Sequence, residues 1–369
     1  MKKYFAILAV AALTLSAACT KVETVTPDQK ISFKAANYVP QTRAGEVSFL
    51  NEFAEGTTPS FKSKAYMMGT GVDNVGTTVT YQDFFGAAGE TITWNPTKKE
   101  WAPSHDYYWP KFDASYINFF SWYDNNGAPV ISREGKTFTM KWENRTIGTG
   151  DNIMYADPAW RFKQNIETYK LNDVQEGVPT LFHHSLAQVE FRAYATKVAV
   201  SGLLNWTIKL TDLKLEVANK GTLTLTATEP ASGNNTKGVW DGTPAWVADA
   251  TTKGNIMPTE DFTVTATNAA DATTAAKVLA NQVVLPQDLS STNLTFKLDI
   301  TTTYTAGQTN REVIDVTIPM GATGFETPAW ALNTKYIYTI KIVPAENRVL
   351  FDPAVETAWT TVNVAEKTL

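Results

Sequence analysis

Apolar and polar residues alternate with a period of two in many short segments of the chain. Residues 222–228 show this most clearly, with leucine or alanine at 223, 225 and 227 and threonine at the positions between them. Such alternation predicts strands with one buried and one exposed face. Similar patterns predict strands over residues 31–35, 91–94, 116–123, 136–142, 189–195, 213–217, 294–300, 313–318 and 336–343.

Turn residues separate these segments, and helical periodicity is hard to find. Asp124-Asn125-Asn126-Gly127 and Asn219-Lys220-Gly221 are typical examples of the turns. Residues 160–174 are the least strand-like stretch, where we expect a loop or a short helix. Many short strands joined by turns favour antiparallel β-sandwiches over alternating strands and helices. The sequence therefore predicts an all-β protein.

A change of composition near residue 180 indicates two domains. The chain before it is rich in aromatic residues, whereas the later strands are rich in threonine, leucine and valine. The polar stretch 172–177 is the best candidate boundary, which gives domains at 44–177 and 178–369. With 369 residues, 43% of them hydrophobic, the chain is long enough for two cores.

The first residues have the pattern of an export signal. Lys2 and Lys3 precede an apolar run over residues 4–18, which ends in small residues immediately before Cys19. This pattern predicts a lipoprotein signal peptide at 1–18, with lipid attached to Cys19. Ser16 stands where a leucine is usual, so a plain signal peptide with an incidental cysteine is the alternative.

Charge and residue counts limit the chemistry that the chain can carry. Lys and Arg total 32 against 37 Asp and Glu, a formal net charge of −5, and no basic stripe is present. A nucleic-acid partner is therefore not expected. One Cys and three His give little material for a zinc site or a disulfide framework. We expect no metal, no cofactor and no catalytic residues.

The remaining polar motifs have structural interpretations. His183 and His184 are neighbours in a predicted strand, so they point to opposite faces and chelate one metal poorly. His105-Asp106 has no evident third partner for acid–base work, which favours a surface loop. Asp124-Asn125-Asn126-Gly127 resembles the start of a calcium loop, but Gly135 occupies the position where that loop needs a glutamate.

Aromatic residues are dense between Trp94 and Tyr123, and two interpretations stay open. Packing in a core is favoured because these side chains bury large apolar areas. Exposed rings could instead stack on sugars, which would make the chain a glycan-binding surface protein. Trp101 and Tyr107 lie outside the clear strand patterns and are the better candidates for exposed ligand contacts.

Several segments, taken in order, resemble the fimbrillin family of Bacteroidales, whose members are subunits of lipoprotein-derived pili. The resemblance extends over nearly the whole chain. Its blocks are the signal ending at Cys19, Ile31-Ser32-Phe33, Thr42-Arg43-Ala44, Tyr108-Trp109-Pro110, residues 117–123, residues 181–191, Val284-Leu285-Pro286-Gln287, Trp330 with residues 335–340, and Val355 with Trp359.

This resemblance implies two transthyretin-like β-sandwiches in tandem and a maturation route. The precursor would be anchored in the outer membrane through the lipid on Cys19 and then cut by an Arg-specific surface protease between Arg43 and Ala44. The cut would remove the propeptide 19–43 with its first strand, whose pocket-filling residues would be Ile31, Phe33 and Ala35. Pro and Gly flank Arg43 and suit an extended, accessible segment, although an ordinary linker arginine is the alternative.

The resemblance also implies a structural role at the cell surface, with other fimbrial subunits as partners. A strand from a neighbouring subunit would fill the vacated groove by donor-strand complementation. The C-terminal segment is the candidate donor, with Val362 and Val364 on one face, unless it is the last strand of its own domain. The alternative function is a pilus-tip adhesin or a surface lipoprotein that binds a host or bacterial glycan or protein ligand.

Overall fold

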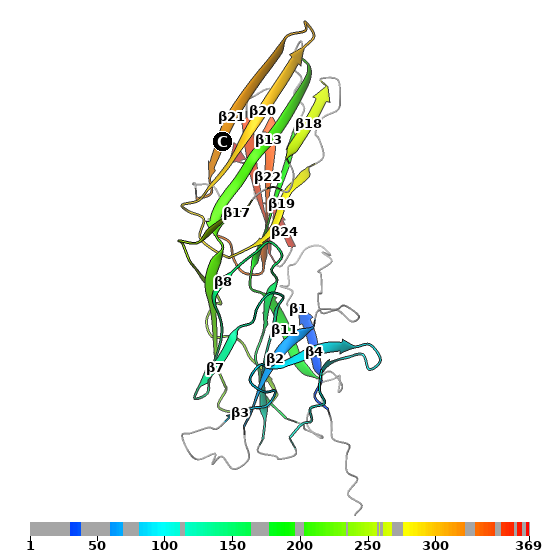
Figure 1. Ribbon diagram of the computed structural model, residues 1–369, viewed down its shortest axis with the longest axis vertical. Helices are drawn as coiled ribbons and strands as arrows, with labels where there is room; N and C mark the ends of the chain where they lie inside the picture. The colour runs from blue at the N-terminus through cyan, green and yellow to red at the C-terminus, as the bar shows by residue number, and fades with distance from the viewer. Residues whose placement is uncertain are drawn as a thin grey trace, which may run out of the picture.

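All regular elements in the described part of the chain are β-strands. The computed structural model describes residues 30–37, 60–68, 81–110, 115–163, 177–195, 203–233, 235–256, 258, 261–267, 276–321, 329–343, 348–357, 360–363 and 367–368. The prediction of an all-β protein is confirmed. The strands form four sheets, arranged as a lower and an upper unit along the long axis (Figure 1).

The main sheet of the lower unit closes on itself. The closure comes from β6 and β2, which pair with each other in addition to their neighbours in the strand order. In order around the ring, the strands are β1 (Phe33–Asn37), β5 (Glu100–Pro103), β4 (Glu90–Asn95), β2 (Phe61–Met68), β6 (Ile117–Asp124), β9 (Ile153–Ala156) and β11 (Val178–His184). The sheet continues beyond the ring into β3 (Tyr81–Asp83), β10 (Ala159–Phe162) and β15 (Thr236–Lys237). Apolar side chains such as Phe33, Phe61 and Phe119 form one buried cluster of this sheet.

A four-stranded sheet covers the lower unit on one side. It contains β16 (Trp246–Ala248), β14 (Lys220–Thr228), β8 (Thr137–Thr146) and β7 (Val130–Glu134) in that order. Its inward side chains, among them Trp142 and Leu223, share a second core with Phe120 and Tyr155 of the ring strands. The alternation in residues 222–228 thus has the predicted cause, since Leu223, Leu225 and Ala227 are all buried.

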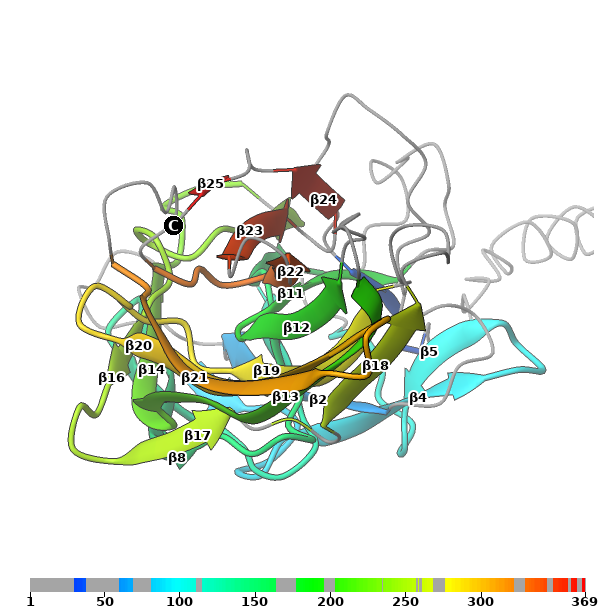
Figure 2. The ribbon, with the colours of Figure 1, turned by 90° about the horizontal axis from the view of Figure 1, so that it is seen from above.

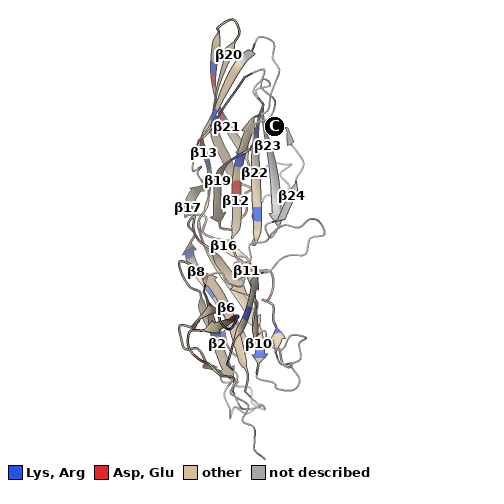
Figure 3. Ribbon diagram, turned by 90° about the vertical axis from the view of Figure 1, so that its right-hand side faces the viewer, with Lys and Arg blue, Asp and Glu red and all other residues tan. Residues whose placement is uncertain are grey.

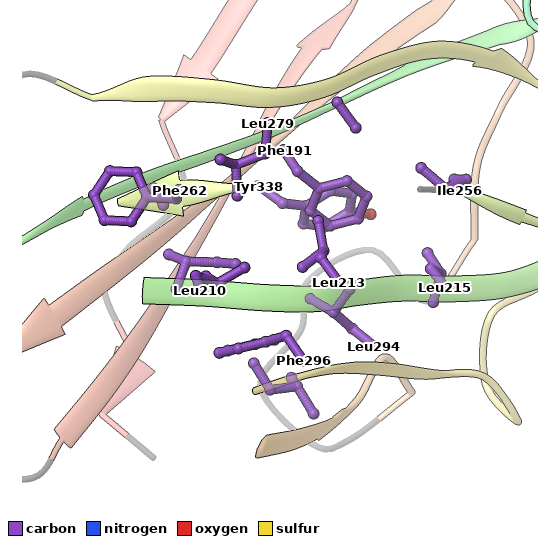
Figure 4. Close-up of a cluster of buried hydrophobic side chains, with 14 of the residues drawn as sticks. Phe191, Leu210, Leu213, Leu215, Ile256, Phe262, Leu279, Leu294, Phe296 and Tyr338 are labelled. Carbon is purple, nitrogen blue, oxygen red and sulfur yellow. The ribbon is translucent and has the colours of Figure 1, made fainter. Parts of the chain in front are cut away.

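The upper unit is a sandwich of two sheets. One contains β19 (Lys277–Val284), β12 (Ala187–Ala195), β22 (Thr334–Val343), β23 (Arg348–Thr357) and β24 (Thr360–Asn363), with β25 (Lys367–Thr368) also paired to β23. The other contains β17 (Lys253–Ile256), β13 (Leu203–Ala218), β20 (Asn293–Tyr304) and β21 (Thr309–Pro319), with β18 (Phe262–Thr267) also on β13. Seen from above, β12 and β13 lie in different layers (Figure 2). The core between the sheets includes Phe191, Leu210, Phe296 and Tyr338 (Figure 4).

Strand pairing crosses the position where the sequence predicts a domain boundary. β11, β14, β15 and β16 all follow residue 177, yet they pair with strands of the lower unit. A division at 177/178 therefore does not separate the sheets. Composition could not show this, because the chain passes directly from β13 in the upper unit to β14 in the lower one through Asn219.

Two further expectations need correction. The sheets are not wholly antiparallel, because β1 pairs with β11 and β12 pairs with β22 in parallel. Ala159–Phe162 form strand β10, so the start of the stretch expected to be a loop or helix is a strand; residues 164–174 lie outside the described residues. With only four residues, β10 is too short for a period of two to be recognised in its sequence.

Candidate strand-exchange site

Strand β1 is one of the strands that form the ring of the lower unit, and it has a neighbouring strand on each side. It runs parallel to β11, with pairs from Phe33–Val178 to Asn37–Phe182, and meets β5 on its other side at Phe33–Trp101. Figure 1 shows β1 beside β11. Removal of β1 would therefore open the ring and leave backbone groups of two neighbouring strands without partners.

Backbone hydrogen bonds continue just before β1. The Ile31 N–H donates to the Tyr107 carbonyl oxygen over 2.8 Å, and the Val178 N–H donates to the Ser32 carbonyl oxygen over 2.8 Å. Lys30 forms an isolated antiparallel bridge with Tyr108. The segment from 30 to 37 is thus held on one side by β11 and on the other by β5 and the loop that follows it.

The side chains of this segment alternate as predicted. Ile31 and Phe33 are each 2% exposed, Ala35 is half-buried, and Lys34 is exposed. The predicted period of two is confirmed, because successive residues of a strand point to opposite faces. Whether the segment is removed from the mature protein stays a prediction.

Phe33 occupies an aromatic pocket. Its ring centroid lies 5.9 Å from that of Phe61 and 5.5 Å from that of Phe119, both edge-to-face, at interplanar angles of 81° and 85°. Phe85 approaches from a third segment at 6.4 Å. Edge-to-face geometry is favourable for aromatic pairs, so the pocket suits a ring in shape and in electrostatics.

Trp101 and Tyr107 belong to the surroundings of this pocket. The expected exposure of Trp101 is wrong, whereas Tyr107 keeps part of its surface exposed. Trp101 lies in β5, is 3% exposed, and packs 5.5 Å from the Phe61 ring. Tyr107 is half-buried, with its ring 4.6 Å from that of Phe85. β5 is too short to display an alternation, so the sequence could not indicate that Trp101 faces the core.

Glu90 fixes the loop that contacts the start of β1. Its carboxylate accepts hydrogen bonds from the Ser104 hydroxyl and, over 3.0 Å, from the Tyr107 hydroxyl. Burial opposes the charged form of Glu90, but bonds from Ser104, Tyr107 and His105 lower its pKa. Burial and the bond to Glu90 raise the pKa of Tyr107. The carboxylate therefore positions the Tyr107 carbonyl that receives the Ile31 N–H.

Lys64 fixes the loop that carries Phe85. Its buried ammonium group lies 2.9 Å from Asp83 Oδ2 and donates over 2.9 Å to the carbonyl oxygens of Gly86 and Ala87. Sequence reasoning did not identify this lysine as a pocket-supporting residue. Alternation could not reveal it, because Lys62 and Lys64 both alternate with the buried face of the strand, which predicts that both are exposed.

The exposed end of β1 carries a charge contact. The Lys30 ammonium group forms a salt bridge with Asp106 and lies 5.8 Å from the centroid of the Tyr108 ring. His105 and Asp106 therefore do lie in a loop, where His105 contacts Glu90 and Asp106 pairs with Lys30. Within the described residues no group of three or more His, Cys, Asp or Glu side chains could hold a metal ion.

The histidine pair lies on β11, the neighbour of β1. His183 Nε2 lies 3.0 Å from Asp157 Oδ1, and its ring stacks on Tyr155 at 5.3 Å between centroids. Both histidines thus belong to a strand, as the sequence predicts.

The other candidate site residues are described only in part. Val362 lies in β24, which folds back on β23 so that Val362 pairs with Val355. The C-terminal segment is therefore paired with its own chain here. Cys19, Arg43, Ala44 and Val364 lie outside the described residues. No helix among the described residues is long and apolar enough to cross a membrane.

Comparison with known proteins agrees with this architecture. A model of the fimbrillin-like family matches residues 57–359. The chain is similar in fold to a fimbrial protein from Bacteroides vulgatus, with a TM-score of 0.52, 15% identity, and coverage of 90% of this chain and 100% of that one. The fimbrial anchor protein Mfa2 from Porphyromonas gingivalis is also matched, at 10% identity and a TM-score of 0.28, over 91% and 100% of the two chains. No curated protein matches the sequence.

The match covers most of the chain, and the chain belongs to the fimbrillin-like family. The resemblance to fimbrillins drawn from the sequence is therefore confirmed. The family is one of fimbrial proteins, which points to a structural protein of the cell surface and to other fimbrial subunits as its partners.

Proposed function

We propose that the chain is a structural subunit of a surface fimbria that polymerises by strand exchange and contributes to adhesion. The position of β1 carries the proposal, because this strand completes a closed ring and fills its core. Arg43 lies between β1 and β2 in the sequence, so a cut after Arg43 would leave β1 bound only by non-covalent contacts. We take the two units to be tandem transthyretin-like sandwiches, the lower one completed by β1.

The physical basis of the exchange is the loss that follows removal of β1. Buried apolar side chains each contribute on the order of 1.5–3 kcal/mol, and Ile31 and Phe33 are both buried. The carbonyl of Tyr107 and the N–H of Val178 would also lose their partners. An incoming extended segment can restore both the hydrogen bonds and the pocket contacts, as in donor-strand complementation.

The proposed route begins with export and lipid attachment at Cys19, which would hold the precursor on the outer membrane. An Arg-specific surface protease would then cut between Arg43 and Ala44. The candidate donor is the C-terminal segment with Val362 and Val364. The pairing of β24 and β25 supports this assignment, because among the described strands they pair only with β23. Both could therefore detach while β22 and β23 stay paired.

Electron microscopy of surface-derived protein tests the proposal. We expect filaments from the wild type, subunits that begin at Ala44, and neither from an Arg43→Ala variant. Lys34→Ala, on the exposed face of β1, is the matched control and should assemble normally. Stable monomers from correctly processed protein would contradict polymerisation and favour a free binding protein. The burial of Trp101 removes the observation that suggested glycan stacking at that residue.

A further inference from the structure

The groove occupied by β1 differs in size and chemistry from one end to the other. Ile31 and Phe33 lie fully inside, Ala35 is half-buried, and Lys30 stays at the surface against Asp106 and Tyr108. In the direction of β1, the groove first accommodates a basic residue (Lys30) and an aliphatic residue (Ile31). An aromatic residue (Phe33) and a small residue (Ala35) follow, each two positions after the last, with Ser32 and Lys34 between them.

The aromatic position is the most restrictive. The pocket around Phe33 is lined by rings from Phe61, Phe85 and Phe119, which come from β2, the loop after β3, and β6. Lys64 holds the Phe85 loop through Asp83 and two carbonyl oxygens, so that wall is fixed by a buried charge. A protein interior tolerates lost volume poorly, and a valine in this pocket would leave a cavity.

The C-terminal segment does not match this pattern. Residues 360–369 read Thr-Thr-Val-Asn-Val-Ala-Glu-Lys-Thr-Leu and contain no aromatic residue. With Val362 at the aliphatic position, Val364 falls at the aromatic position and Glu366 at the small one. Its basic residue, Lys367, is followed by threonine and leucine and not by an aliphatic residue and a ring.

We propose that the groove selects a strand from a different subunit, one that carries a basic residue, then an aliphatic residue, then an aromatic residue two positions later. Residues 360–369 of a second copy are the occupant that the groove rejects, so as a donor this segment would enter the groove of a different subunit. This inference rests on the proposed strand exchange and specifies its partner. The ring pocket supplies the discrimination, and the contact of the basic residue with Asp106 and Tyr108 helps to fix the register through a weak, salt-sensitive ion pair.

The test uses the full chain with a specific protease site introduced between residues 44 and 57. After the cut, the first strand stays in place and exchanges with fluorescein-labelled peptides, whose binding is followed by anisotropy. The peptides are residues 29–37, the same sequence with Phe33→Val, Phe33→Ala or Lys30→Gln, the control Lys34→Gln, and residues 360–369. All compete with the same resident strand, so their affinities are directly comparable.

We expect the unaltered peptide and Lys34→Gln to bind equally, and Phe33→Ala to bind about 100-fold more weakly or worse. Phe33→Val should lose about tenfold or more, and Lys30→Gln a few-fold at low salt. Residues 360–369 should not displace the resident strand. Equal binding by Phe33→Val or by residues 360–369 would overturn the inference while strand exchange stands. Failure of every peptide, the unaltered one included, would overturn strand exchange itself.

Discussion

Phe33 is the residue on which the candidate groove depends most. Its ring contacts aromatic rings from three segments that are far apart in the sequence, so their backbones cannot easily collapse into the space it would leave. Phe33→Ala in the uncut chain should lower the free energy of unfolding by about 3–5 kcal/mol, measured by denaturant titration. Lys34→Ala, its exposed neighbour, should change it by less than about 0.5 kcal/mol. Equal effects of the two substitutions would show that the ring is not part of the core.

Glu90 makes the loop beside β1 sensitive to acid. Its folded-state pKa is lower than the unfolded value of about 4.5, so the unfolded chain binds more protons in this range. The stabilisation is therefore complete above that value and declines as the pH falls through the folded-state pKa. Glu90→Gln should remove this part of the pH dependence, which unfolding titrations between pH 3 and pH 7 would measure. An unchanged acid profile in the variant would assign the loss to other carboxylates.

The buried hydrogen-bond network around Glu229 could not be predicted from the sequence. Its buried carboxylate accepts hydrogen bonds from Tyr81, from Tyr116 and Asn118 over 2.6 Å each, and from Arg161 over 3.0 Å. Burial and the bond to Glu229 raise the pKa of Tyr116 to about 12. These partners come from separate strands and loops, so only the folded topology brings them together.

At the scale of elements, long alternating segments could be predicted and short ones could not. The segments expected at 189–195, 294–300 and 336–343 all lie within β12, β20 and β22. β5 and β10 have four residues each, too few for a period to emerge. Nor does alternation specify a neighbour, which is why the parallel β1–β11 pair and the ring closure by β2 and β6 needed the structure.

The C-terminal hairpin gives a prediction at this scale. Among the described strands, β24 pairs only with β23, whereas β23 is paired along its length with β22. Deletion of residues 362–369 should therefore leave a folded, exported subunit with an unfolding midpoint close to that of the full chain. The same subunit should no longer extend filaments in electron microscopy. Normal filaments from the truncated chain would place the donor elsewhere, and loss of folding would make the segment structural.

At the scale of the whole molecule, the charged residues are dispersed along both units (Figure 3), and the units share a core. Leu186 and Leu285 adjoin strands of the upper sandwich, yet they pack in the cluster that contains Trp142 and Leu223 of the lower unit. Gln287 also makes hydrogen bonds at the junction of the two units. Its side chain accepts from the Ala218 N–H over 2.9 Å and donates to the Ala218 carbonyl oxygen over 2.9 Å.

A shared core predicts that the two units unfold together. Calorimetry of the full chain should show one transition, because opening either unit would expose side chains that the other unit buries. Leu285→Ala, which removes a fully buried side chain from the junction, should lower the stability by about 2–5 kcal/mol and broaden or split the transition. Val313→Ala, on an exposed position of β21, should leave a single transition unchanged. Two resolved transitions in the unaltered chain, with only one of them shifted by Leu285→Ala, would mean that the junction transmits no stability from one unit to the other. In the proposed filament, a subunit under tension would need that transmission, since units that opened separately would make the subunit yield at its weaker half.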